Sequence, residues 1–148
     1  MGAPGPLERF ARAQAPVLSQ VSAELRAGRK QTHWMWFVFP QLRGLGRSPT
    51  AELYAITSLE EAQAYLADPV LGPRLRECTQ LVNAIEGRAI GEIFGFPDDL
   101  KFRSCMTLVA RAAASGSASA GPDVFHAALE KYFGDEEDPR TLELLRQP

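Results

Sequence analysis

The sequence predicts a mainly α protein, a single-domain multihelical array with a buried aromatic segment. Three observations predict it: apolar residues recur at helical spacing, glycine and proline separate the repeats, and no series of alternating strands is present. At 148 residues, with 45% apolar and 23% charged residues, the chain resembles one ordinary soluble domain spanning 1–148. We expect flexibility in residues 1–6 and in the Ser/Ala/Gly-rich loop 115–121.

Two short helices are expected at the start of the chain. Segment 7–14 has helical apolar spacing and ends before Pro16. A second helix begins at Pro16, buries one apolar face and stops at Gly28.

The next segment, 33–42, reads His-Trp-Met-Trp-Phe-Val-Phe-Pro-Gln-Leu and contains both tryptophans of the chain. It is too short and too uniformly apolar for an amphipathic helix. Periodicity leaves two alternatives open, an extended segment or a buried helical turn. A loop of high backbone freedom, 43–49, follows it.

The remaining chain reads as helices with recognisable ends. Ser58 and Glu61 have the spacing of a capping box, which predicts a helix to about residue 67. The clearest helical signature covers 70–85, where apolar residues alternate steps of four and three. The further expected elements are a short turn over 89–94, a helix from Pro97 that buries Phe102, Cys105, Met106, Val109 and Ala113, a helix from Pro122 to Gly134, and a last helix from Asp138 to about Leu145.

Composition excludes several functional classes. The 16 basic residues are outnumbered by 18 acidic ones, so generic nucleic-acid binding is not expected. No apolar run is long enough to span a membrane and no signal peptide is evident, so we expect a cytoplasmic protein. Cys78 and Cys105 read as buried small hydrophobic residues. The two histidines lack metal-ligand spacing, and neither a metal site nor a cofactor is predicted.

The aromatic run carries the strongest functional signal. In an extended segment Trp34 and Trp36 would lie on one face and form a stacking platform for a base or nicotinamide. The alternative is that both rings belong to the core, because tryptophan buries a large area. Polar residues at the rims of the run, Lys30, His33 and Gln41 among them, favour a ligand site.

Two weaker signals lie elsewhere. Gly44-Leu45-Gly46 is a fragment of a phosphate-binding loop, to which Arg43 or Arg47 would add charge. The segment 98–104 gathers Asp98, Asp99, Lys101, Arg103 and Ser104 at a helix start. The structural alternative there is a capped, solvated helix terminus.

Several motifs together resemble a bacterial family, the domain of unknown function numbered 1810. The matching segments are Arg29-Lys30-x-x-His33-Trp34-Met35-Trp36-Phe37-x-Phe39-Pro40-Gln41, Gly44-Leu45-Gly46-x-Ser48, Tyr54-Ala55-Ile56, Tyr65-Leu66-x-x-Pro69-x-Leu71-Gly72-x-Arg74-Leu75, Ile93-Phe94-Gly95, Asp98-Asp99-x-Lys101, Ser104-x-Met106-Thr107-Leu108 and Tyr132-Phe133. The resemblance covers 7–145 and implies a single, mostly helical domain. Cys105 and Val109 depart from the family pattern, which usually has serine and often has phenylalanine there.

The family resemblance brings no activity with it. Some members carry the label calpastatin, a disordered inhibitor, whereas helical periodicity and caps run through this chain. The chain also shares residue types, without an alignment, with small helical hydrolases associated with NAD and ADP-ribose. Those enzymes combine a tryptophan-rich segment, a lysine and acidic residues in one pocket.

These observations give an enzyme hypothesis, hydrolysis of an N-glycosidic bond in a nucleotide or ADP-ribose-type ligand. The candidate catalytic residues are Asp99, Lys101 and His33. The residues expected to bind the ligand are Arg29, Lys30, Trp34, Trp36, Gln41, Arg43, Gly44, Gly46, Ser48 and Ser104. Two alternatives stay open: a non-catalytic module that binds a nucleotide or another small molecule, and a protein-interaction domain that uses an exposed apolar patch.

Overall fold

Short helices joined by tight connections build the described chain, and no strand occurs within it. The computed structural model describes residues 7–115 and 123–147. The elements are α1 (Glu8–Gln14), η1 (Ala15–Val17), α2 (Leu18–Arg26), α3 (Met35–Val38), α4 (Pro49–Leu53), α5 (Leu59–Ala67), α6 (Leu71–Asn83), α7 (Ile90–Phe94), α8 (Asp98–Ser115), α9 (Val124–Phe133) and α10 (Pro139–Arg146). The predicted mainly α, multihelical class is confirmed.

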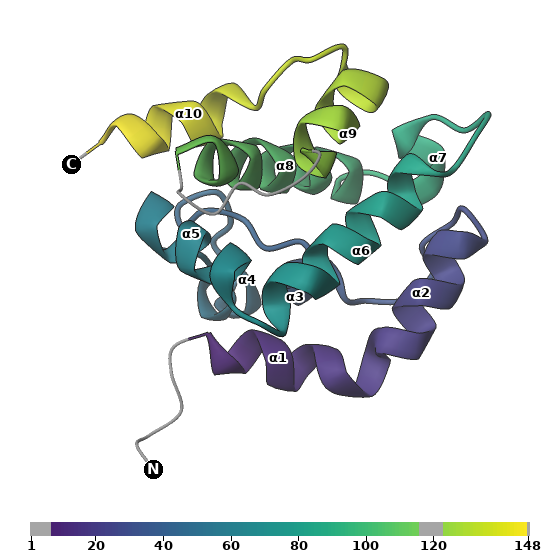
Figure 1. The fold of residues 1–148 in the computed structure, drawn as a ribbon, viewed down its shortest axis with the longest axis horizontal. Coiled ribbons are helices and arrows are strands. Elements are labelled where there is room, and N and C mark those ends of the chain that lie inside the picture. The colour runs from purple at the N-terminus through teal and green to yellow at the C-terminus, as the bar shows by residue number, and fades with distance from the viewer. Residues whose placement is uncertain (1–6, 116–122, 148) are drawn as a thin grey trace.

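The longest helix, α8, lies at the centre of the array. It contacts α5, α7, α9 and α10, and α6 packs against α2, α5 and α9. Figure 1 shows α1 and α2 along one edge of the molecule and α9 and α10 along the opposite edge, with α8 between them. Because α8 has neighbours on several sides, its residues 104–110 are all buried.

Most predicted helices are present, with small changes at their ends. Ser58 caps α5 by accepting a hydrogen bond from the Glu61 amide at 3.1 Å, whereas the Glu61 carboxylate accepts from Thr57 and not from the cap residue. The last helix of the chain is capped by Asp138. The short helix α4 was not predicted. Ser115 belongs to α8, and the predicted flexible segments 1–6 and 116–121 lie outside the described residues.

The aromatic run forms a helical turn, which decides between the two alternatives left open by its sequence. Because residues 35–38 are helical, neighbouring side chains point in different directions. Trp34 and Phe39 join a cluster with Phe94 and Phe102, in which Phe39 and Phe102 have ring centroids 5.1 Å apart. Phe37 instead packs against Tyr54 at 5.3 Å. The run therefore joins two parts of the core.

The two cysteines are buried and free, as predicted. Burial raises the pKa of the Cys78 thiol to about 11, so this side chain is an uncharged core group at neutral pH. Across residues 7–115 and 123–147, no helix has the length and apolar character needed to cross a membrane.

Candidate functional site

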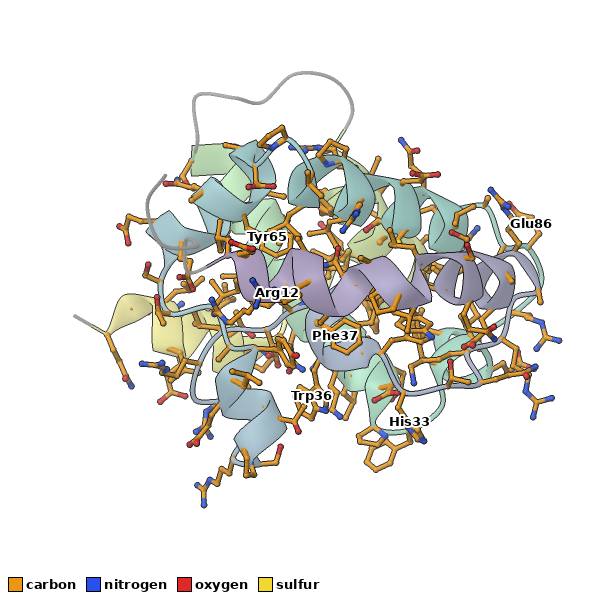
Figure 2. The ribbon with its side chains drawn as sticks, turned by 90° about the horizontal axis from the view of Figure 1, so that it is seen from below. Arg12, His33, Trp36, Phe37, Tyr65 and Glu86 are labelled. Carbon is orange, nitrogen blue, oxygen red and sulfur yellow. The ribbon has the colours of Figure 1, made fainter. Side chains whose placement is uncertain are left out.

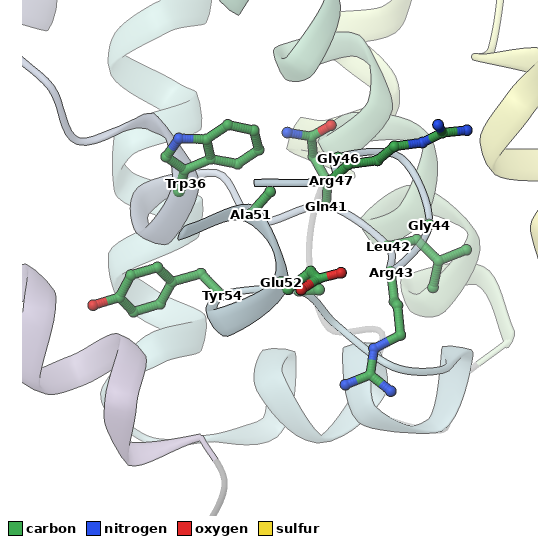
Figure 3. Close-up of a pocket in the computed structure, with 11 residues that line it drawn as sticks. Trp36, Gln41, Leu42, Arg43, Gly44, Gly46, Arg47, Ala51, Glu52 and Tyr54 are labelled. Carbon is green, nitrogen blue, oxygen red and sulfur yellow. The ribbon is translucent and has the colours of Figure 1, made fainter. Parts of the chain in front are cut away.

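A cavity of about 490 Å³ opens beside Trp36, between α3, the loop that follows the aromatic run, and α4. Its volume lies within the range of small-molecule sites. The residues that line it are Trp36, Gln41, Leu42, Arg43, Gly44, Gly46, Arg47, Ala51, Glu52, Tyr54 and Ala55. Figure 3 shows Trp36, Gln41 and Arg47 along one side and Tyr54, Glu52 and Arg43 along the other.

Backbone hydrogen bonds hold the two walls of the cavity together. The Arg43 amide donates to the Ile56 carbonyl at 2.7 Å, and the Ile56 amide donates to the Gln41 carbonyl at 2.9 Å. These bonds form an isolated parallel bridge between Leu42 and Ile56. The bridge therefore fixes the chain before and after α4 side by side in the cavity wall.

Two glycines permit the close packing of this loop. A Cβ atom at Gly46 would lie 2.6 Å from the Ala51 Cβ, which is closer than real Cβ contacts come, and 3.3 Å from the Trp36 ring, which is tighter than most such contacts. Gly44 has a φ of +103°, a conformation that L side chains rarely adopt. Both predicted glycines line the cavity, where they set the path of its wall.

The polar groups of the cavity have few partners within the protein. Arg43, Arg47 and Glu52 are exposed, and none of them forms an ion pair with another described residue. Gln41 is 9% exposed, and its amide nitrogen is buried without a hydrogen-bond partner. A buried donor without an acceptor costs about 1–3 kcal/mol. The cavity thus presents two unpaired cations, and one of its lining side chains holds a buried, unsatisfied donor.

A charged cluster covers one face of the Trp36 ring. The Lys101 ammonium lies 3.8 Å from the ring centroid and 3.3 Å from the Asp98 carboxylate. The other oxygen of Asp98 is 2.9 Å from the Lys30 ammonium, and the Lys30 side chain is only 7% exposed. The sequence indicated Asp99, not Asp98, as the candidate carboxylate. A helix start does not reveal which of two adjacent carboxylates turns toward the aromatic run.

Trp34 takes no part in the cavity. It is 1% exposed, and its indole N–H donates to Glu24 at 3.0 Å. No ligand can stack on this ring within the fold. Figure 2 shows Trp36, by contrast, near the surface on the side where His33 also lies. The two tryptophans therefore have different surroundings, and only Trp36 is placed to meet a ligand.

Glu24 organises the chain that precedes the aromatic run. Its buried carboxylate accepts hydrogen bonds from the Thr32 hydroxyl at 2.6 Å, the backbone amides of Gln31 and Thr32, the Gln20 side chain and Trp34. Burial by itself would raise the pKa of this carboxyl, but the hydrogen bonds outweigh burial and lower the pKa to about 2. Glu24 is therefore ionised in the folded protein at neutral pH.

This lowered pKa predicts a pH dependence of stability. Because the folded-state pKa lies below the ordinary value of 4.5, Glu24 stabilises the fold above pH 4.5 and loses this contribution as pH falls toward 2. The contribution reaches up to about 3 kcal/mol. We expect Glu24→Gln to lower the free energy of unfolding at pH 6 much more than at pH 3, measured by urea unfolding. Glu60→Gln, at an exposed glutamate, is the matched control, and an equal loss for Glu24→Gln at both pH values would contradict the prediction.

The other predicted site residues do not line the cavity. Ser104 is buried, and its hydroxyl donates to Asp138 at 2.9 Å, so it supports the junction of α8 and α10. Ser48 caps α4 by accepting from the Ala51 amide. Asp99 accepts from the Leu100 amide in the first turn of α8. Arg29 and His33 are exposed.

The structure therefore groups some of the predicted residues and separates others. Trp36, Gln41, Arg43, Gly44 and Gly46 share the cavity. Lys30 and Lys101 meet through Asp98, beside Trp36. Glu52 and Tyr54 were not predicted as lining residues, although both closely follow the glycine loop and Tyr54 belongs to a segment that resembles the family. Within the described ranges, no group of three or more His, Cys, Asp or Glu residues could hold a metal ion.

Comparison with known proteins gives a family and a similar structure. Residues 4–145 match the family described as "Protein of unknown function (DUF1810)". The chain belongs to this family. The resemblance seen in its motifs is thereby confirmed for nearly the whole DUF1810 chain.

A solved structure resembles this DUF1810 protein over its whole length. It is the crystal structure of the conserved hypothetical protein Rv1873 from Mycobacterium tuberculosis, which is 60% identical in sequence. The match covers 99% of this chain and 100% of that one, with a TM-score of 0.90. No curated protein matches the chain in sequence.

Proposed function

We propose that this DUF1810 protein binds a small phosphorylated ligand with a flat ring, of the nucleotide or ADP-ribose class, in the cavity beside Trp36. The observation that carries the proposal is the buried Gln41 amide nitrogen, which lacks a partner in a cavity wall that also holds two unpaired arginines. Native proteins leave few buried polar groups unsatisfied, and those that remain call for an explanation. This nitrogen has almost no accessible surface, so a ligand acceptor would satisfy the donor once the Gln41 side chain turns toward the cavity.

Each wall of the cavity suits one part of such a ligand. Arg43 and Arg47 carry planar guanidinium groups, which bind phosphate oxygens in a bidentate manner. The Trp36 ring offers an aromatic surface on which a base can stack. Gln41 would then donate a hydrogen bond to an acceptor atom of the ligand. The three contacts together distinguish a phosphorylated ring compound from a simple anion.

Hydrolysis of an N-glycosidic bond is a second candidate function, favoured by one observation. The Glu52 carboxylate lines the same cavity and could activate a water molecule beside a bound sugar. None of the predicted catalytic residues Asp99, Lys101 and His33 lines the cavity, so Glu52 would replace Asp99 as the base. We expect Glu52→Gln to abolish release of the free base while ligand binding persists. Chromatography of the reaction mixture measures the free base.

A ligand screen tests the binding proposal. Purified protein is heated with NAD, ADP-ribose and common nucleoside phosphates, and the shift in melting temperature is recorded. A ligand at 100 times its dissociation constant adds about 2.7 kcal/mol to the free energy of unfolding, which gives a clear shift. We expect at least one phosphorylated ligand to stabilise the protein.

The variants for this screen separate specific binding from general charge effects. Arg43→Gln combined with Arg47→Gln should abolish the stabilisation, because the ligand loses both phosphate contacts. Arg26→Gln removes an exposed arginine at the end of α2 and should preserve it. Absence of a shift with every ligand would contradict the proposal and favour the protein-interaction alternative, for which the exposed Leu53, Val70, Phe96 and Leu100 are the first residues to test.

A further inference from the structure

The cation on the Trp36 ring limits what can stack on its open side. Lys101 lies in the first turn of α8 with its ammonium 3.8 Å from the ring centroid, and it is not among the residues that line the cavity. A ligand in the cavity therefore meets the part of the ring that Lys101 leaves open. A ligand ring that stacks on Trp36 must use the face opposite Lys101, because an ammonium 3.8 Å from the centroid leaves no room for a ring between them.

The positive charge of Lys101 is only partly cancelled by its neighbours. Asp98 contacts Lys101 at 3.3 Å and Lys30 at 2.9 Å, so one carboxylate serves two ammonium groups. The cluster keeps a net charge of one positive unit. On the cavity side Arg43 and Arg47 add two cations against the single carboxylate of Glu52. Positive charge thus dominates both sides of the Trp36 ring.

Aromatic rings attract cations through the negative potential of their faces. At Trp36 the Lys101 ammonium already occupies one face of the ring and polarises the electron density toward that face. The opposite face is therefore less attractive to a second cation. A positively charged ring stacked on the open side would also lie about 7 Å from the Lys101 ammonium, close enough for appreciable repulsion at the edge of a protein. A neutral ring avoids this repulsion and can still stack.

Resting on the proposed function, we infer that Lys101 makes the cavity selective for phosphorylated ligands whose flat ring is uncharged, and that it weakens the binding of cationic rings such as oxidised nicotinamide. Lys101 is a specificity-determining residue in this account and does not contact the ligand itself. The ligand is anionic at its phosphate and neutral at its ring.

Matched pairs of mononucleotides test the inference by isothermal titration calorimetry. One pair is oxidised and reduced nicotinamide mononucleotide, which share phosphate, ribose and carboxamide and differ in the charge of the ring. The second pair is adenosine monophosphate and its N1-methylated form, whose ring is positive at neutral pH. We expect the neutral member of a pair to bind about tenfold more tightly, the ratio produced by like charges about 7 Å apart at an effective dielectric constant near 20 when Asp98 offsets part of the repulsion.

The decisive variant is Lys101→Met, which keeps the length of the side chain and removes its charge. It should bring the affinity ratio within a pair close to one, mainly through tighter binding of the cationic member. Lys131→Met, on α9, removes a lysine that contacts backbone carbonyls of α6 and the segment after it, and should leave the ratio unchanged.

The outcomes separate this inference from the proposal on which it rests. Equal affinities within a pair, tighter binding of the cationic member, or a ratio that survives Lys101→Met would overturn the inference while leaving nucleotide binding in place. Failure of all four compounds to bind would overturn nucleotide binding at this cavity, and the selectivity of Lys101 with it.

Discussion

Replacement of Trp34 by alanine should lower the free energy of unfolding by about 3–5 kcal/mol. The ring is 1% exposed and packs against Phe39 and Phe94, so its removal leaves a large void in the aromatic cluster. It also removes one of the donors that hold the buried Glu24 carboxylate. Urea unfolding followed by circular dichroism measures the loss without depending on tryptophan fluorescence.

Two further variants keep this prediction testable if Trp34→Ala does not fold. Trp34→Phe retains part of the buried area and should give an intermediate loss of stability. Trp36→Ala should lower the free energy of unfolding by less than half as much as Trp34→Ala, because Trp36 is only half-buried. A larger loss for Trp36→Ala than for Trp34→Ala would show that the two rings have been assigned to the wrong environments.

Replacement of Trp36 by alanine should instead remove most of the ligand affinity. Stacking of a base on an aromatic side chain contributes about 1–3 kcal/mol, so the dissociation constant should rise about 5- to 150-fold. The measurement is a calorimetric titration with the ligand that gives the largest thermal shift. Trp36→Phe retains a ring and should recover part of the affinity.

The opposite result would relocate the site. If Trp36→Ala binds the ligand as tightly as the unchanged protein, the cavity beside Trp36 is not the binding site. A groove around Leu7, Ala11 and Leu71 would then be the next place to examine, because it encloses about 710 Å³ and is also lined by described residues.

The sequence predicted the long helices well because their signals are local. Alternating steps of three and four between apolar residues define α6, and Ser58 with Glu61 marks the start of α5. The short helix α4 was missed because its five residues, Pro49–Leu53, are too few to show a helical periodicity. Short elements are positioned by their neighbours, not by their own pattern.

The candidate site was harder to predict because it depends on contacts between distant segments. The bridge between Leu42 and Ile56 brings Tyr54 into the same wall as Gln41, and no local pattern encodes it. The roles of Trp34 and Trp36 depend on whether their segment is extended or helical, and the run is too short for periodicity to decide. The polar residues near the aromatic run indicated the right region for a site. Only the three-dimensional fold showed which of its residues belong to the core and which line the cavity.

The central claim, that a phosphorylated ligand binds beside Trp36, is tested most directly by nuclear magnetic resonance of the labelled protein. The chain has two tryptophans, so its spectrum contains two indole N–H signals. On titration with the stabilising ligand, we predict large shifts of the Trp36 indole and of the Gln41 side-chain amide, with a much smaller shift of the Trp34 indole. Shifts concentrated at other residues, with the Trp36 and Gln41 signals unmoved, would contradict the claim.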